Sequence, residues 1–317
     1  MQKKYKKLIS VILKLLILAA SYLYIWQKIK SQSRWDVFPE ALSDWAFFAA
    51  AFVLMPLNWF IESYKWQYIL KKTEKIKIWT AAESVFAGIT LGIFTPNRIG
   101  ELAGRILVLK KTHRLKGIFS AGLSSLSQTL PTLIFGILGA WYIWQDLFSD
   151  THTPDTEFLL IGLLALLFSV LLFLLYFRID LLSGFFAGFK FSYKLKEAVK
   201  LLGRFSQQEL SGVLSFSISR YPIFMLQLYL LLLFFGVELS FLTVFAAGAA
   251  AFFINFIIPS IALADLGIRG SSALFFFGLY ISNDAAVLSA VFALWLINLV
   301  IPALIGSVIL LRLKIIS

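Results

Sequence analysis

The chain has 317 residues, of which 60% are hydrophobic, and its mean hydropathy is +0.85. A water-soluble globular domain is excluded, because such domains contain only about 45–50% apolar residues. The net charge of +12 would favour nucleic-acid binding in a soluble protein, but the basic residues here lie between apolar segments, so we expect no nucleic-acid partner.

Six apolar segments are long enough to cross a bilayer, which requires about 20 residues of α-helix. Lipid offers no hydrogen-bond partner to backbone N–H and C=O groups, so the spans are expected to be helices. We therefore predict an all-α polytopic membrane protein with six full spans: Leu8–Trp26, Trp45–Ile61, Gly117–Trp144, Phe158–Phe177, Val213–Gly236 and Ala285–Leu311.

Between the spans, the segment Trp79–Lys110 is apolar but interrupted. Lys65 and four further lysines precede it, and more basic residues close and follow it, which places both flanks in the cytoplasm by the positive-inside rule. A segment that enters and leaves on one side is re-entrant. Pro96 and Asn97 are the expected reversal point, and Gly104 is expected to shape the hairpin.

A second interrupted segment is Ser240–Asn283, whose flanks carry acids but neither lysine nor arginine. Both flanks are therefore expected outside. Its return part, Ser271–Ser282, is too short to span at about 1.5 Å per residue. We predict a second re-entrant hairpin that enters from the opposite side, shaped by Pro259 and Gly267.

The charges and the order of elements indicate an internal repeat. Most of the 29 lysines and arginines lie in segments that this layout places in the cytoplasm, whereas the loop Gln145–Glu157 has acids and neither lysine nor arginine. Both termini are therefore expected in the cytoplasm. The order span, span, hairpin, span occurs twice with opposite orientation, so we expect one integral membrane domain with halves 1–150 and 151–317. Transporters of this kind bind substrate between the halves.

Arg98, Glu101 and Arg105 follow the first expected reversal. In a helix they would share one face, with Glu101 neutralising one arginine while the other keeps free donors for a phosphate or carboxylate. A helix N-terminus there would add partial positive charge. The alternative is that the arginines anchor the segment at the membrane interface and pair with Glu101 only for insertion.

Asp265 and Arg269 stand four residues apart in the second hairpin, so a helix would pair them. They are expected to bind substrate, or alternatively only to fix the hairpin geometry. Arg220 lies about two turns inside a span beside Pro222, where it lines a cavity or extends to the headgroups. The sequence does not decide between these two positions of Arg220.

Asn58, Glu62 and Glu83 are further polar candidates in apolar segments, for which the favoured alternative is that helix packing satisfies them. The cluster Ser124, Ser125, Ser127 and Gln128 is expected to serve helix packing. The chain has no cysteine, and its two histidines, His113 and His152, lie in separate polar stretches. We therefore expect no metal site and no cofactor. No nucleotide-binding GxxxxGK[ST] loop occurs, and no histidine base lies in a span, so we do not expect an enzyme.

The sequence resembles the flippase-like transmembrane domain of bacterial lysylphosphatidylglycerol synthases, a family with many stand-alone members. The motifs that carry this resemblance are NWFIESYKW (Asn58–Trp66), TPNRIGELAGR (Thr95–Arg105) and IPSIALADLGIR (Ile258–Arg269). The resemblance implies flipping of anionic or aminoacylated phospholipids, or of related lipid-linked carriers. It also implies a substrate role for Arg98, Glu101, Arg105 and Arg269.

Two features depart from that family. The full synthases carry a soluble aminoacyl-transferase domain after the membrane part, whereas this chain ends at Ser317, so we expect no synthase activity. In relatives the second motif is often glycine-rich with an acid after the arginine. Here alanines and a leucine replace the glycines at 262–264, Asp265 precedes Arg269, and Gly270 follows it.

We therefore expect a lipid flippase in the bacterial cytoplasmic membrane, with an anionic lipid headgroup bound by Arg98, Glu101, Arg105, Arg220, Asp265 and Arg269. A homo-oligomer or an envelope-synthesis enzyme is the expected protein partner. The alternative is a membrane scaffold or regulator of envelope lipid or glycan synthesis that transports nothing itself.

Overall fold

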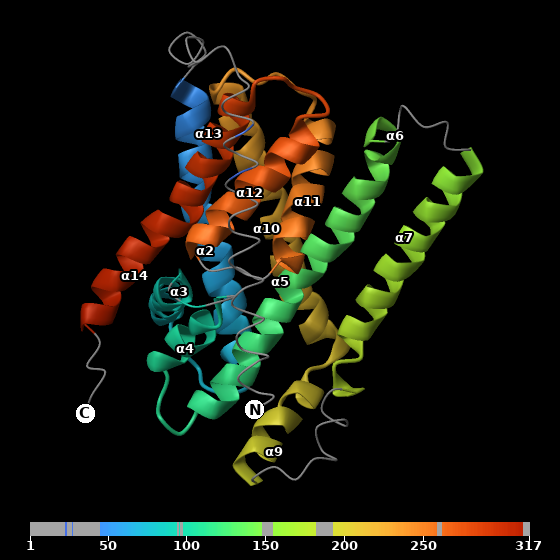
Figure 1. The fold of residues 1–317 in the computed structure, drawn as a ribbon. Helices are drawn as coiled ribbons and strands as arrows, with labels where there is room; N and C mark the ends of the chain where they lie inside the picture. Colours follow the sequence, from blue (N-terminus) through green and yellow to red (C-terminus); the bar gives the residue numbers. More distant parts are fainter. Residues whose placement is uncertain are drawn as a thin grey trace, which may run out of the picture.

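The structure of the protein is a computed structural model that describes residues 23, 27, 45–93, 95, 98–147, 155–181, 193–258 and 262–312. All regular structure in these residues is helical (Figure 1). The predicted span Leu8–Trp26 lies almost entirely outside the described residues. So do Pro96, Asn97 and Pro259, three of the residues that we expect to shape the hairpins.

The helices in chain order are α2 (Trp45–Leu70), α3 (Ile78–Ile93), α4 (Gly100–Leu107), α5 (Arg114–Tyr142), α6 (Trp144–Leu147), α7 (Asp155–Phe177), α9 (Tyr193–Lys200), the 3-10 turn η2 (Leu202–Arg204), α10 (Gln207–Phe234), α11 (Phe241–Ile257), α12 (Ala262–Phe277), α13 (Asp284–Trp295), the π-helical turn η3 (Leu296–Val300) and α14 (Ile301–Arg312). Five stretches are long and apolar enough to cross a membrane: Trp45–Leu70, Arg114–Tyr142, Thr156–Phe177, Gln207–Phe234 and Asp284–Arg312. Each overlaps a predicted span, so the prediction of an all-α polytopic membrane protein is confirmed. The total number of spans stays a prediction.

Helix α2 is longer than the predicted span Trp45–Ile61 and continues to Leu70. The prediction ended the span early because it assigned Lys65 to a cytoplasmic loop, and this assignment is wrong. Lys65 is 0% exposed and Glu62 is 1% exposed. A helix can carry such charges through a protein interior when each has an oppositely charged partner there.

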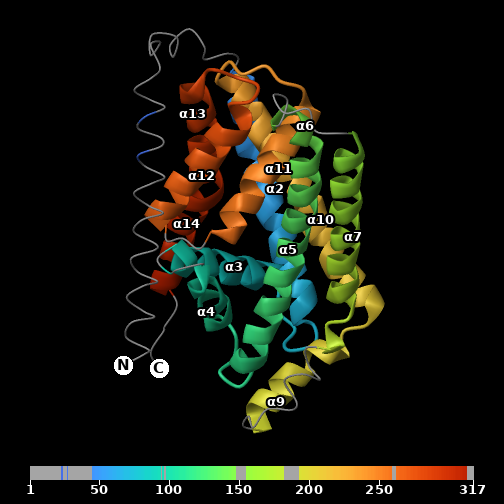
Figure 2. The same cartoon turned by 45° about the vertical axis from the view of Figure 1, so that its right-hand side comes forward.

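Helices α3 and α4 form a hairpin with unusually close backbones. Each helix has two glycines four residues apart, Gly88 and Gly92 on α3 and Gly100 and Gly104 on α4. A Cβ atom on Gly104 would lie 2.4 Å from the carbonyl oxygen of Ala87. This pattern of small residues lets two helices approach closely in a membrane. Figure 2 shows α3 lying across the long axes of α2 and α5.

Helices α11 and α12 pack against each other as the second hairpin. The predicted return segment, Ser271–Ser282, begins too late, because α12 already begins at Ala262. Asp265 and Arg269 therefore lie in the return helix itself. Helix α11 also packs on α5 at Gly136, where a Cβ atom would lie 2.4 Å from Phe253 Cβ.

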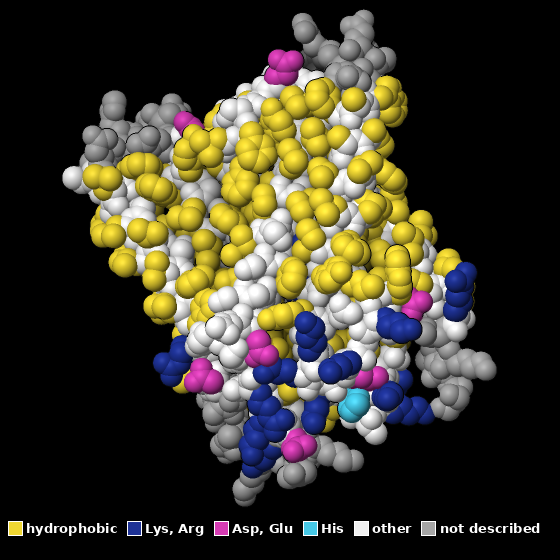
Figure 3. Space-filling view, turned by 180° about the vertical axis from the view of Figure 1, so that it is seen from behind, with side chains coloured by type: hydrophobic (Ala, Val, Ile, Leu, Met, Phe, Trp, Pro, Cys, Tyr) yellow, Lys and Arg dark blue, Asp and Glu magenta, His cyan; other side chains and the backbone are white. Residues whose placement is uncertain are grey.

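Residue types separate along the long axis of the molecule (Figure 3). Hydrophobic side chains cover the middle and upper part of this face, and lysines and arginines gather at the lower end. The loops α2–α3 and α4–α5 and helix α9 lie at that end (Figure 1). An apolar belt beside a basic end is typical of a multi-pass membrane protein, and we predict that the basic end faces the cytoplasm.

We predict that Gly104→Ala lowers the midpoint of thermal unfolding in detergent by several degrees. The added methyl group would overlap the α3 backbone, and overpacking of this kind costs about 1–3 kcal/mol. Gly122→Ala is the matched control, since a Cβ atom there meets no other group within 4 Å. Equal midpoints for the two variants would contradict the close approach of α3 and α4.

Candidate functional site

Helix α2 places three polar side chains on one face, Asn58, Glu62 and Lys65, at positions i, i+4 and i+7. All three are buried. On a helix that crosses a membrane, polar groups at this spacing face the protein interior, because exposure to lipid would leave them unsolvated. The face of α2 that carries these residues therefore forms one side of a buried polar site.

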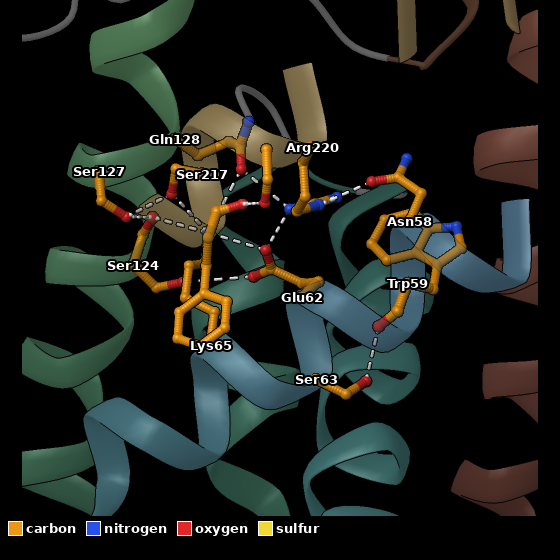
Figure 4. A network of polar contacts seen from close by, with 12 residues as sticks. Asn58, Trp59, Glu62, Ser63, Lys65, Ser124, Ser127, Gln128, Ser217 and Arg220 are labelled. Atoms are coloured by element: carbon orange, nitrogen blue, oxygen red, sulfur yellow. Dashed lines mark hydrogen bonds and ion pairs between the residues drawn. The ribbon is translucent and has the colours of Figure 1, made fainter. Parts of the chain in front are cut away.

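The Glu62 carboxylate binds three cations from three helices. Its Oε2 lies 2.8 Å from Lys65 Nζ and also accepts a hydrogen bond from Arg220 Nη1. Its Oε1 lies 2.7 Å from Arg105 Nη2. Figure 4 shows Glu62 between Lys65 and Arg220, with the α5 side chains Ser124 and Ser127 to their left. Removing one partner from such a buried group costs about 3–5 kcal/mol, so the cluster binds α2, α4 and α10 to one another.

Arg105 extends from α4 into this cluster. It pairs with Glu101, one turn earlier, at 2.6 Å, and donates to Ser124 Oγ at 3.3 Å. Its guanidinium lies 5.4 Å from the ring centre of Trp66. The stem of the side chain passes over Gly88, where a Cβ atom would lie 2.8 Å from Arg105 Cγ. The glycine contact between α3 and α4 therefore makes room for Arg105.

Arg220 extends from α10 into the protein interior. Its Nε donates to Asn58 Oδ1 at 2.7 Å, its Nη1 donates to Gln128 Oε1 at 2.9 Å, and its guanidinium lies 5.2 Å from the ring centre of Trp59. The sequence leaves open whether Arg220 lines a cavity or reaches the headgroups. In the structure it lines the cavity.

Lys65 lies behind Glu62 and takes part in the same network. Its Nζ donates to Gln128 Oε1 and Ser217 Oγ, both at 3.3 Å, and to the Ser124 carbonyl at 3.4 Å. Ser127 and Ser217 hydroxyls lie 3.0 Å apart beside it (Figure 4). The serines and Gln128 of α5 therefore do more than pack helices, since they solvate buried charges.

A cavity of about 670 Å³ opens next to this network. Its wall contains all six residues that the sequence predicts as the binding site: Arg98, Glu101, Arg105, Arg220, Asp265 and Arg269. With Glu62, the described wall carries four arginines and three carboxylates, so positive charge is in excess. Cavities of roughly 300–1,000 Å³ are typical of ligand sites. No group of three or more carboxylates or histidines suited to a metal occurs in the described residues.

Arg98 is placed differently from the prediction. The predicted helical face that joins it to Glu101 and Arg105 is wrong, because α4 begins only at Gly100. Arg98 lies in the turn before α4 with a φ of 57°, and its side chain is exposed at the cavity wall. A positive φ outside glycine is uncommon and marks the sharp reversal of the chain between α3 and α4.

Asp265 and Arg269 pair as predicted for a helix, with 2.8 Å between Asp265 Oδ2 and Arg269 Nε. One turn further on, Ser272 donates to Asn255 Oδ1 at 3.0 Å and joins α12 to α11. Gly267 is buried between the two charged residues. This pair forms a second polar region on the same cavity wall.

Sequence reasoning missed three contributors, Lys65, Gln128 and Asn298. The spacing of Lys65 from Asn58 and Glu62 is a usable signal. Asn298 has no comparable signal, because it lies in the π-helical turn η3, which directs its side chain to Asn58 at 3.3 Å. Pro302 lacks the N–H that would bond the Asn298 carbonyl in an α-helix, which favours the local change of helix type.

We predict that Arg220→Lys lowers the free energy of unfolding by about 2 kcal/mol, since a lysine cannot reach Asn58, Glu62 and Gln128 with one planar fork. The midpoint of thermal unfolding in detergent would report the loss. Arg204→Lys is the control, because Arg204 is exposed and lies outside the cavity. An unchanged midpoint in Arg220→Lys would show that the network contributes little.

The chain was compared with known proteins. A family model described as the lysylphosphatidylglycerol synthase TM region matches residues 11–306, which is nearly the whole chain. Comparison with curated proteins gives no match. The resemblance expected from the three motifs is thereby confirmed. The chain belongs to the family of the lysylphosphatidylglycerol synthase transmembrane region, a family of membrane proteins related to lipid synthesis or flipping.

Proposed function

We propose that this protein moves a phospholipid with an anionic or modified headgroup, or a related lipid-linked carrier, between the leaflets of a membrane. One observation supports this most directly. A cavity with four arginines and three carboxylates in its wall lies inside a multi-pass helical membrane protein of this family. Ionisable groups inside a membrane protein usually mark the path of a charged substrate.

The polar groups of the cavity wall would replace the hydration that a charged headgroup loses when it leaves water. Moving a charge to the centre of a bilayer costs about 3 kcal/mol or more. Guanidinium groups match phosphate oxygens with paired N–H donors, so Arg105, Arg220 and Arg269 would stabilise a phosphate inside the protein. Apolar wall residues such as Phe224 and Phe252 would lie next to the start of the acyl chains, which stay in lipid.

Residues from both predicted halves line the cavity. Arg105 belongs to residues 1–150, whereas Arg220 and Arg269 belong to residues 151–317. In transporters with inverted repeats, rocking of one half against the other opens a central site to each side in turn. We propose this mechanism here, with the α3–α4 and α11–α12 hairpins as re-entrant elements of opposite orientation.

We propose that the protein lies in the bacterial cytoplasmic membrane with both termini inside and that it carries out no chemical step. Its ligand is a lipid headgroup, and its candidate protein partners are a second copy or an envelope-synthesis enzyme. The alternative, a scaffold or regulator that transports nothing, is distinguished by the following experiment.

We predict that purified protein in proteoliposomes exchanges labelled phosphatidylglycerol between leaflets faster than phosphatidylcholine. The exchange rate of the double variant Arg105→Ala/Arg269→Ala should be about tenfold lower, because two phosphate-binding groups are removed. The measurement is the fraction of labelled lipid open to a membrane-impermeant quencher over time.

The matched control is Arg178→Ala/Arg312→Ala, which also removes two arginines but leaves the cavity wall intact. It should exchange lipid as the unmodified protein does. Arg269→Gln adds a test on a partly exposed residue, so its loss of exchange would not reflect a collapsed interior. Folded protein that exchanges no lipid would contradict the proposal and favour the scaffold.

A further inference from the structure

We propose that the Glu62 carboxylate is an internal anion that holds Arg105 and Arg220 in the empty protein, and that the phosphate group of the ligand takes its place. The inference rests on the proposed function, because it concerns the same cavity. It deepens that function by naming the residue with which the ligand competes and the two arginines between which the phosphate sits.

The geometry of Glu62 is that of an anion that bridges two arginines. Its two oxygens are divided between two guanidinium groups, with Oε1 on Arg105 and Oε2 on Arg220. Guanidinium groups bind carboxylate and phosphate oxygens with the same donor pattern. Arg105, Arg220 and Glu62 all lie in the cavity wall, so a phosphate entering the cavity meets both arginines at the point where Glu62 now binds them.

Lys65 is the ion-pair partner that Glu62 keeps when it no longer binds the two arginines. It lies 2.8 Å from Glu62 and is fully buried, but it is not part of the cavity wall. Its other contacts, with Ser217 and Gln128, hold it behind that wall. A ligand in the cavity can therefore replace Glu62 on the arginines while Glu62 remains paired with Lys65.

The charge balance of the cluster selects the class of ligand. Three cations, Lys65, Arg105 and Arg220, face two carboxylates, Glu62 and Glu101, which leaves one positive charge in excess. A phosphodiester carries one negative charge and would make the buried cluster neutral. Neutral buried clusters avoid the large cost of an unbalanced charge away from water. The cluster is therefore suited to a monoanionic phosphate ester.

The test is a change that removes the internal anion without changing the net charge. In Glu62→Gln/Lys65→Gln, the cluster keeps one excess positive charge, but Arg105 and Arg220 lose their shared carboxylate. We expect this variant to bind dioctanoyl-phosphatidylglycerol about tenfold more tightly than the unmodified protein. Dissociation constants would be measured in neutral detergent by native mass spectrometry, beside dioctanoyl-phosphatidylcholine and inorganic phosphate.

The matched control is Glu209→Gln/Lys72→Gln. This change also removes a carboxylate and a lysine joined at 2.8 Å, but from a partly exposed pair outside the cavity. Its affinity for every probe should equal that of the unmodified protein. A gain in the cavity variant for both phospholipids supports exchange with the phosphodiester that they share, and a gain for phosphatidylglycerol alone supports exchange that also requires a net negative headgroup. An equal gain for inorganic phosphate supports the same exchange with free phosphate as a second source.

Glu62→Asp keeps the inference testable if the double variant does not fold. The carboxylate stays charged but is one methylene shorter, so it cannot hold both arginines at their present positions, and binding should tighten about threefold. Unchanged or weaker binding of phosphatidylglycerol in the folded variants would overturn the inference. That result leaves lipid exchange by the unmodified protein intact, so it is distinct from a failure of the proposed function.

Discussion

Glu62, Lys65 and Arg105 are buried and the Arg220 side chain is only 11% exposed, so the free energy lost on removing these charges from water has to be recovered inside the protein. The carboxylate does this by binding Lys65 on its own helix, Arg105 on α4 and Arg220 on α10. The contacts with Arg105 and Arg220 fix the positions of α4 and α10 relative to α2. The ion cluster is therefore a structural element as well as a candidate binding site.

The packing of the surrounding helices follows from the need to bring these groups together. Arg105 reaches Glu62 because the glycines of α3 and α4 allow close contact and leave space for its stem. Asn58 is held by Asn298, whose position depends on the π-helical turn before α14. Small residues and a local change in helix type thus serve one purpose, which is to satisfy polar groups where water is absent.

The same cluster supports the proposal that the cavity binds a charged headgroup. A site that was neutral without ligand would become negative on binding a phosphodiester. This cluster has three cations and two carboxylates, so a bound phosphodiester would make it neutral. The second polar region, Asp265 and Arg269 on α12, is close to neutral by itself and lies across a wall rich in aromatic rings. This asymmetry supports a ligand with one phosphate and a further polar part, as expected of a phospholipid headgroup.

The class of protein follows from the sequence alone, because the length and apolarity of the segments decide whether helices can cross a membrane. The family could also be recognised from three short motifs, and the six predicted binding residues do meet at one cavity. Local rules were sufficient for the pair Asp265 and Arg269, since a spacing of four residues in a helix brings them together.

The tertiary structure decided which charge is central. From the sequence, Lys65 has the appearance of a loop lysine and Glu62 of a satisfied polar residue. The arginines that pair with Glu62, Arg105 and Arg220, are 43 and 158 positions away in the chain. No local pattern encodes such distances, nor the turn that removes Arg98 from the helical face of Glu101. Whether a buried charge is tolerated depends on partners that only the folded chain supplies, and these long-range ion pairs therefore became visible only in the structure.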